Sequence, residues 1–103
     1  MLSLLKKLFG GNSVDYTTLV ANGAKMIDVR TPGEYSSGHA KGSTNIPLDT
    51  LDHKLASMKK NDVYILCCRS GMRSGSAVSK MKAKGFTNVY NAGPWTNLKG
   101  LKK

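Results

Sequence analysis

Residues 62–86 read D-V-Y-I-L-C-C-R-S-G-M-R-S-G-S-A-V-S-K-M-K-A-K-G-F, and this stretch decides the fold. Its beginning, residues 63–66, is a run of β-branched, aromatic and aliphatic side chains, which predicts a short buried strand. Apolar residues then recur at helical spacing at Ala77, Val78 and Met81. The few residues between these two patterns leave room only for a tight loop. The stretch therefore predicts a strand, a loop and a helix in succession.

Cys68 lies where the predicted strand ends, and it begins a loop of sequence C-R-S-G-M-R-S. Gly71 is the residue of this loop that most readily adopts a positive φ angle. Successive backbone N–H groups in a curled loop form a site for anions, and the N-terminus of the following helix adds to the positive field. Arg69 and Arg73 contribute two further positive charges. Because all of these groups favour thiolate over thiol, we interpret Cys68 as a nucleophile and expect the group that it carries to be anionic.

Two motifs resemble those of the rhodanese (thiosulfate sulfurtransferase) family. The loop C-R-S-G-M-R at residues 68–73 resembles the family's active-site loop, Cys-Arg-x-Gly-x-Arg, which follows an apolar strand. Residues 26–48, M-I-D-V-R-T-P-G-E-Y-S-S-G-H-A-K-G-S-T-N-I-P-L, resemble the family's other signature, D-V-R-x-x-x-E-[YF]-x-x-G-H-I-x-G-A-x-N-I-P. The motifs occur in the family's order, and the resemblance covers residues 12 to about 101.

The order of the predicted elements indicates an α/β fold in a single small domain. Short strands are predicted at residues 26–29, 44–46, 63–66 and 87–90. Helical spacing predicts helices over residues 16–20, 48–58, 73–84 and 94–101, with at most one helical turn near residue 34. The alternation favours a mainly parallel sheet covered on both faces. The resemblance implies a rhodanese-like three-layer sandwich, with a mainly parallel central sheet of about five short strands. Residues 12–103 would form this rhodanese-like domain, and residues 1–11 an N-terminal amphipathic helix or extension.

The resemblance also implies a sulfurtransferase activity. Cys68 would attack the sulfane sulfur of thiosulfate or a related donor, become a persulfide, and pass the sulfur to cyanide or to a thiol acceptor. The residues expected to bind the transferred sulfur and its donor are those of the loop: Arg69, Ser70, Gly71, Met72, Arg73 and Ser74. Four residues of the other signature are expected to support the site structurally: Asp28, Arg30, Glu34 and His39. This chemistry implies no metal and no organic cofactor.

The position of Cys67 leaves other functions of the loop open. Cys67 and Arg73 satisfy the spacing Cys-x-x-x-x-x-Arg of tyrosine-phosphatase loops, which hold a tetrahedral phosphate. A ring that closes from Cys68 is one residue tighter and suits a single sulfur atom, and Leu66 stands where such phosphatases have a His. Strand alternation places Cys67 on the opposite face from Cys68, in the core. Phosphatase or arsenate reductase chemistry is therefore the alternative, together with a non-enzymatic persulfide carrier or docking module.

The charge of the chain predicts anionic partners. Sixteen Lys and Arg residues against six Asp and Glu residues give a net charge of +10 in 103 residues. Such a basic protein attracts anions. Together with the resemblance, this implies small anionic sulfur donors and an acidic sulfur-carrier protein as partners. Aromatic residues do not alternate with the charges, so nucleic acid is not an expected partner. No apolar run is long enough for stable insertion into a membrane. Two adjacent cysteines disfavour a structural disulfide and predict a reducing, cytoplasmic location.

Overall fold

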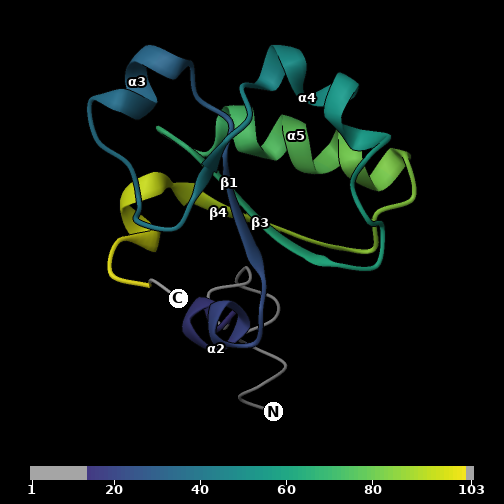
Figure 1. Cartoon of the computed structure of the whole chain (residues 1–103), viewed down its shortest axis with the longest axis horizontal. Helices are drawn as coiled ribbons and strands as arrows, with labels where there is room; N and C mark the ends of the chain where they lie inside the picture. Colours follow the sequence, from purple (N-terminus) through teal and green to yellow (C-terminus); the bar gives the residue numbers. More distant parts are fainter. Residues whose placement is uncertain (1–13, 102–103) are drawn as a thin grey trace.

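Four short strands form one parallel sheet at the centre of the computed structural model, which describes residues 14–101 (Figure 1). In spatial order the strands are β2 (Thr44–Asn45), β1 (Lys25–Asp28), β3 (Val63–Cys68) and β4 (Asn88–Pro94). Each neighbouring pair is parallel, so all four strands end at the same edge of the sheet. The predicted parallel sheet is confirmed, with four strands in the described residues where about five were expected.

Helices cover both faces of this sheet (Figure 1). One face carries α4 (Leu48–Leu55) and α5 (Met72–Ala83). The other face carries α2 (Tyr16–Ala21) and the 3-10 helix η1 (Trp95–Leu98). The short helix α3 (Pro32–Ser36) follows β1 at the edge where the strands end. The chain therefore has the predicted three-layer α/β architecture.

Alternation along β3 builds the two cores of the molecule. Tyr64, Leu66 and Cys68 point into the core beneath α4 and α5. Ile65 and Cys67 point into the opposite core, beneath α2 and η1. All five residues are at most 2% exposed, which explains why this central strand carries no charged side chain. Burial of each large aliphatic side chain contributes about 1.5–3 kcal/mol to folding.

Three elements differ in length from the sequence prediction. α4 ends at Leu55, and Met58 reaches the core from the turn that follows. β4 continues to Pro94, well beyond the predicted end near Tyr90. As a result the last helix is reduced to the single 3-10 turn of η1. The helical turn near residue 34 is present as α3, and a capping box between Thr31 and Glu34 begins it.

The predicted amphipathic helix of residues 1–11 lies outside the residues that the structure describes. The predicted domain boundary at residue 12 lies outside them as well, and both stay predictions. Within residues 14–101, every helix is too short or too polar to traverse a lipid bilayer.

Candidate functional site

The loop between β3 and α5 encloses the sulfur of Cys68. Cys68 is the last residue of β3, and α5 begins at Met72. Between them Gly71 adopts a φ angle of +103°, in the left-handed region that favours glycine. With this turn the N–H of Gly71 donates a hydrogen bond to Cys68 Sγ at 2.9 Å. A Cβ atom at Gly71 would lie 3.2 Å from Cα of Gly93, so the turn also needs glycine for space.

Ser74, in the first turn of α5, completes the set of donors around the sulfur. Its hydroxyl oxygen lies 3.4 Å from Cys68 Sγ. Burial alone raises the pKa of Cys68, but hydrogen bonds from the Ser74 hydroxyl and from the backbone N–H groups of Ser74, Gly71 and Ser70 outweigh it. The pKa therefore falls from its usual value of 9.0 to about 7. Cys68 is thus substantially ionised at neutral pH.

Cys67 faces away from this ring of donors. It packs in the opposite core with Val20 and Leu98. Burial, reinforced by the negative charge of Asp28, raises the pKa of Cys67 to about 12. Cys67 is therefore a protonated core residue, and the N–H groups of the loop converge on Cys68 instead.

Asp28 and Arg30 form a buried ion pair at the end of β1. Arg30 Nη2 lies 2.8 Å from Asp28 Oδ2, and the two side chains are 5% and 0% exposed. Arg30 Nη2 also donates to the carbonyl oxygen of Gly38 at 2.6 Å, and the guanidinium lies 4.9 Å from the ring centre of Trp95. The pair thus ties β1 to the segment around Gly38 and to η1, close to the loop.

Glu34 connects α3 to α5. Arg73 donates from Nη1 to Glu34 Oε1 at 2.7 Å and from Nη2 to Oε2 at 3.0 Å. The hydrogen bond from Arg73 and that from the backbone of Thr31 lower the pKa of Glu34 from 4.5 to about 2. The charge of Arg73 is therefore paired at neutral pH, and its guanidinium fixes the first turn of α5 against α3.

These features coincide with a known family. A family model described as "Rhodanese-like domain" matches residues 5–93. The chain belongs to the rhodanese-like family.

Relatives of this rhodanese-like chain include enzymes of sulfur transfer. Thiosulfate sulfurtransferase PspE of Escherichia coli is 39% identical over an alignment of 69 residues, which covers 65% of this chain and 66% of PspE. Uncharacterized protein YqhL of Bacillus subtilis is 37% identical over 68 residues, which are 66% of this chain and 54% of YqhL. The aligned part thus spans between half and two thirds of these relatives.

The solved structure titled "rhodanese with anions from E. coli" has a similar fold. It aligns with a TM-score of 0.68 and 35% identity, over 73% of this chain and 91% of that chain. The similarity therefore extends over nearly the whole of that solved rhodanese.

The remaining predicted site residues of the rhodanese-like domain have different environments. His39 is exposed; its Nδ1 donates to the carbonyl oxygen of Tyr35 at 2.7 Å, and the two rings stack with centres 3.7 Å apart. These contacts hold the ring of His39 against Tyr35. The side chain of Met72 is 82% exposed, and its backbone N–H is 3.4 Å from Ser70 Oγ. Met72 therefore lies at the rim of the loop, and the donors to the sulfur come from Ser70, Gly71 and Ser74.

A shallow cavity of about 330 Å³ borders the loop of the rhodanese-like domain. It is lined by Arg30, Glu34, Ser37, Arg69 and Trp95. Within residues 14–101, Arg69 makes no ion pair, in contrast to Arg30 and Arg73. Arg69 therefore brings an unneutralised positive charge to the mouth of this cavity.

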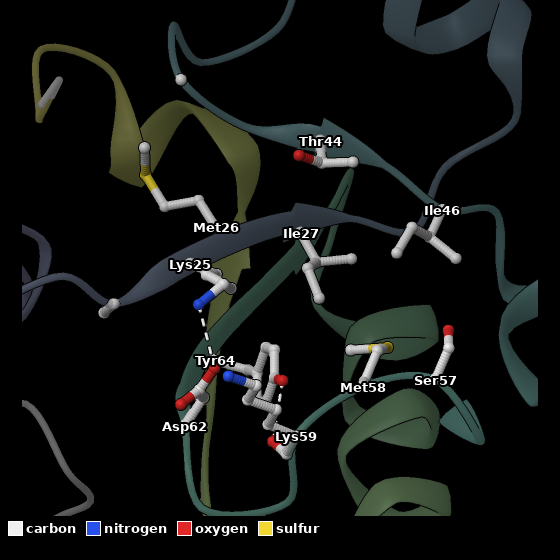
Figure 2. A pocket seen from close by; sticks show the side chains of 12 residues that line it. Lys25, Met26, Ile27, Thr44, Ile46, Ser57, Met58, Lys59, Asp62 and Tyr64 are labelled. Carbon is white, nitrogen blue, oxygen red and sulfur yellow. Dashed lines mark hydrogen bonds and ion pairs between the residues drawn. The ribbon is translucent and has the colours of Figure 1, made fainter. Parts of the chain in front are cut away.

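Two larger cavities lie away from Cys68. One, of about 590 Å³, lies between α3 and α4 and includes Arg73 at its edge. The other, of about 580 Å³, lies at the opposite end of the strands, around the ion pair between Lys25 and Asp62 (Figure 2). Its apolar wall includes Ile27 and Met58 (Figure 2). Cys68 lines neither of them, and of the three cavities only the smaller one is lined by Arg69, the residue that follows Cys68. We therefore take the smaller cavity as the candidate site.

Asn91 of β4 is a residue at this site that the sequence analysis did not identify. Its Nδ2 donates to the carbonyl oxygen of Gly71 at 3.1 Å. Its Oδ1 accepts the hydroxyl of Ser74 at 2.7 Å and the N–H of Gly93 at 2.9 Å. The available signal was an asparagine in a strand pattern, where this residue type is uncommon, at the edge where all the strands end.

Proposed function

We propose that this chain is a sulfurtransferase that carries a sulfane sulfur on Cys68. The observation that supports the proposal best is the set of donors around the sulfur. Gly71 N–H lies 2.9 Å from Sγ and the Ser74 hydroxyl 3.4 Å from it, in a site without exposed sulfur surface. Donors held in such a site stabilise a negative charge that would otherwise be costly to bury. These donors suit a thiolate, and the N–H groups of the loop also suit the terminal sulfur of a persulfide.

The proposed reaction is a double displacement. The thiolate of Cys68 attacks the outer sulfur of thiosulfate, the new S–S bond forms, and sulfite leaves with the electron pair of the broken S–S bond. Cyanide or a thiolate acceptor then attacks the outer sulfur of the persulfide, and Cys68 leaves as thiolate. Each step exchanges one nucleophile for another at sulfur, so no external oxidant or reductant is consumed.

We assign different tasks to the two arginines of the loop. Arg69 is exposed and lines the cavity beside the loop, where its charge attracts an anionic donor. Arg73 is held by Glu34 and keeps the loop in its curled shape. Because Cys68 itself is 0% exposed, a donor must displace side chains at the loop surface to reach the sulfur, which favours a slim donor such as thiosulfate.

The phosphatase alternative needs a ring that closes from Cys67. Cys67 lies in the opposite core with its pKa raised to about 12, which argues against that register. Both cysteines are free thiols, and a reducing compartment such as the cytoplasm suits a reaction that depends on one of them. The positive charge of +10 favours an acidic sulfur-carrier protein as the acceptor in the cell.

Intact-protein mass spectrometry tests this proposal. Thiosulfate should add the mass of one sulfur atom to the protein, and cyanide should remove it. The Cys68→Ser variant should gain nothing, because a serine hydroxyl is not ionised at neutral pH. The matched Cys67→Ala variant should load like the native protein. Loading that requires Cys67, or no loading together with hydrolysis of an aryl phosphate, would overturn the proposal.

Steady-state turnover separates an enzyme from a passive carrier. An enzyme should release thiocyanate repeatedly when purified protein is mixed with thiosulfate and cyanide. A single turnover per protein, with normal loading of Cys68, would show a persulfide carrier that depends on a partner.

A further inference from the structure

A β-bulge places Asn91 against the loop. Leu66 of β3 pairs with Asn91, whereas the next residue, Cys67, pairs with Gly93. Ala92 is therefore the extra residue of β4 at this point. Bulges change the direction of side chains and are frequent beside functional sites. This one brings the amide of Asn91 to the loop that encloses Cys68.

The orientation of the Asn91 amide is fixed by its two backbone partners. The carbonyl oxygen of Gly71 can only accept a hydrogen bond, so the group 3.1 Å away must be the NH₂ of Asn91. The N–H of Gly93 can only donate, so the atom 2.9 Å away must be the amide oxygen. The amide therefore cannot be turned over without the loss of both bonds, and its oxygen faces Ser74.

The hydroxyl of Ser74 has two acceptors and one proton. Asn91 Oδ1 lies 2.7 Å from Ser74 Oγ, and Cys68 Sγ lies 3.4 Å from it. Ser74 is 0% exposed, so bulk water does not supply a third partner. The proton can make only one of the two bonds well at a time. The amide oxygen and the sulfur therefore compete for it.

We propose that Asn91 is a positioning residue that acts on Cys68 through Ser74, by holding the hydroxyl proton whenever the sulfur of Cys68 is uncharged. When Cys68 is a thiolate, the hydroxyl turns to the sulfur. In a persulfide the charge lies on the outer sulfur, so the hydroxyl returns to Asn91. This last step rests on the proposed function, whereas the competition itself does not.

The exchange has two physical consequences. A buried hydroxyl keeps a partner at every stage, which avoids the cost of an unsatisfied donor. In addition, competition from Asn91 limits how strongly the thiolate is stabilised. A thiolate of very low pKa is a weaker nucleophile, so this limit preserves the reactivity of Cys68.

Other charged or titratable groups around Cys68 come from five parts of the fold. They are Arg73 of α5 with its partner Glu34 of α3, Arg69 of the loop, Cys67 of β3, and the pair of Asp28 and Arg30 at the end of β1. Replacement of Asn91 or Ser74 removes none of these groups, and Cys67 is Ala in every variant that is compared. They form a constant background against which the effect of Asn91 can be measured.

A double-mutant cycle on the pKa of Cys68 tests the proposal. The pKa is read from the rate of alkylation against pH in a Cys67→Ala background, without any sulfur donor. Asn91→Ala should lower the pKa by about half a unit, which gives roughly threefold more thiolate below the midpoint. In the Ser74→Ala background the same replacement should have no effect. Asn97→Ala is the matched control, because the Asn97 amide donates to the Ala92 carbonyl at 2.8 Å without contact to Ser74, and it should leave the pKa unchanged.

The Asn91→Asp variant tests the same competition in the opposite direction. Its carboxylate accepts the hydroxyl proton more strongly, so the pKa of Cys68 should rise, and it should rise more with Ser74 present than in the Ser74→Ala background. If Asn91→Ala does not fold, the Asn91→Asp variant still tests whether Asn91 and Cys68 compete for the Ser74 proton. Equal shifts in both backgrounds, or none, would overturn the proposal and leave Asn91 a purely structural residue. If the double-mutant cycle gives the expected pKa shifts but thiosulfate does not load Cys68, only the proposed function is overturned.

Discussion

Arg73 and Glu34 meet in a two-point contact, with Nη1 2.7 Å from Oε1 and Nη2 3.0 Å from Oε2, although 39 residues separate them in the chain. The same carboxylate accepts the N–H of Thr31 at 3.0 Å and so caps α3. One side chain therefore begins α3 and holds the first turn of α5. Each partner belongs to one of the two sequence motifs, so this contact makes the motifs a single structural unit.

The pairing predicts different kinetic defects for the two arginines of the loop. Arg69→Ala should raise KM for thiosulfate roughly threefold to tenfold at low salt, and less for a neutral persulfide donor, because its charge is unneutralised. Added salt should reduce the difference between the donors. Arg73→Ala should lower kcat/KM for both donors by a similar factor, because its charge is already paired with Glu34. A larger dependence on donor charge for Arg73 than for Arg69 would reverse these assignments.

Acid should weaken the contact in a defined range of pH. The pKa of Glu34 is lowered from 4.5 to about 2, chiefly by its hydrogen bond from Arg73. The stabilisation is therefore fully present above about pH 4.5 and is lost as the pH falls through about 2. The difference in Tm between the native protein and Glu34→Gln should narrow across this range. The difference in Tm between the native protein and Arg73→Ala should narrow over the same range, because this variant removes the same ion pair. A difference in Tm that stays constant down to about pH 2 would contradict the lowered pKa of Glu34.

Much of the fold was predictable because its signals are local. The uninterrupted apolar run that ends at Cys68 indicates a strand buried on both faces, and β3 is one of the two interior strands of the sheet. Gly71 indicates a turn with positive φ, and it has one. Strand alternation separates Cys67 from Cys68, and the two side chains do lie in opposite cores.

What the sequence did not reveal depends on how distant segments pair. Asn91 reaches the loop because β4 bulges against β3, and no local pattern specifies that register. Arg30, just after β1, likewise contacts Trp95 of η1, 65 positions further along the chain. Sequence periodicity reports only on nearby residues, so it could not predict this contact. The final helix was overestimated because Trp95 and Leu98 have helical spacing, although β4 extends to Pro94.

Gly71→Ala should be costly for both stability and chemistry. The residue has a φ angle of +103°, and an added Cβ would lie 3.2 Å from Cα of Gly93. We expect a loss of about 1–3 kcal/mol in the free energy of unfolding, together with a higher pKa of Cys68 as the Gly71 N–H moves away. Gly33→Ala is the matched control, because nothing lies within 4 Å of its added Cβ and its φ is not positive. The free energy of unfolding of Gly33→Ala, measured by urea denaturation, should stay within about 0.5 kcal/mol of the native value.

Breaking the buried ion pair of Asp28 and Arg30 should cost far more stability than breaking a surface ion pair. Asp28→Asn leaves the guanidinium of Arg30 without its counter-charge at a site 5% exposed, which should cost about 3–5 kcal/mol. Lys25→Met removes a surface pair with Asp62, whose side chains are 58% and 34% exposed, and should cost at most about 1 kcal/mol. Urea denaturation measures both losses. Similar costs for the two variants would show that the Asp28–Arg30 pair is not desolvated as its burial indicates.

The two adjacent cysteines should differ strongly in reactivity. Cys68 has a pKa of about 7, because hydrogen bonds from Ser74, Gly71 and Ser70 outweigh its burial. Cys67 has a pKa of about 12, because burial and then the charge of Asp28 disfavour its thiolate. Alkylation by a small reagent should therefore modify Cys68 alone in the native protein, with a midpoint near pH 7. In concentrated urea both thiols should titrate near the usual value of 9.0.

The same shifts give opposite contributions to stability. The folded-state pKa of Cys68 lies below its usual 9.0, so its contribution is fully present above about pH 9 and is lost as the pH falls through about 7. The folded-state pKa of Cys67 lies above its usual value, so its contribution is present below about pH 9 and is lost as the pH rises toward 12. Cys67→Ala should therefore retain more of its stability than the native protein between about pH 9 and 11, whereas Cys68→Ala should lose less than the native protein between about pH 9 and 7. Equal alkylation rates for the two thiols, or the same pH dependence of unfolding in both variants, would show that the loop donors do not act selectively on Cys68.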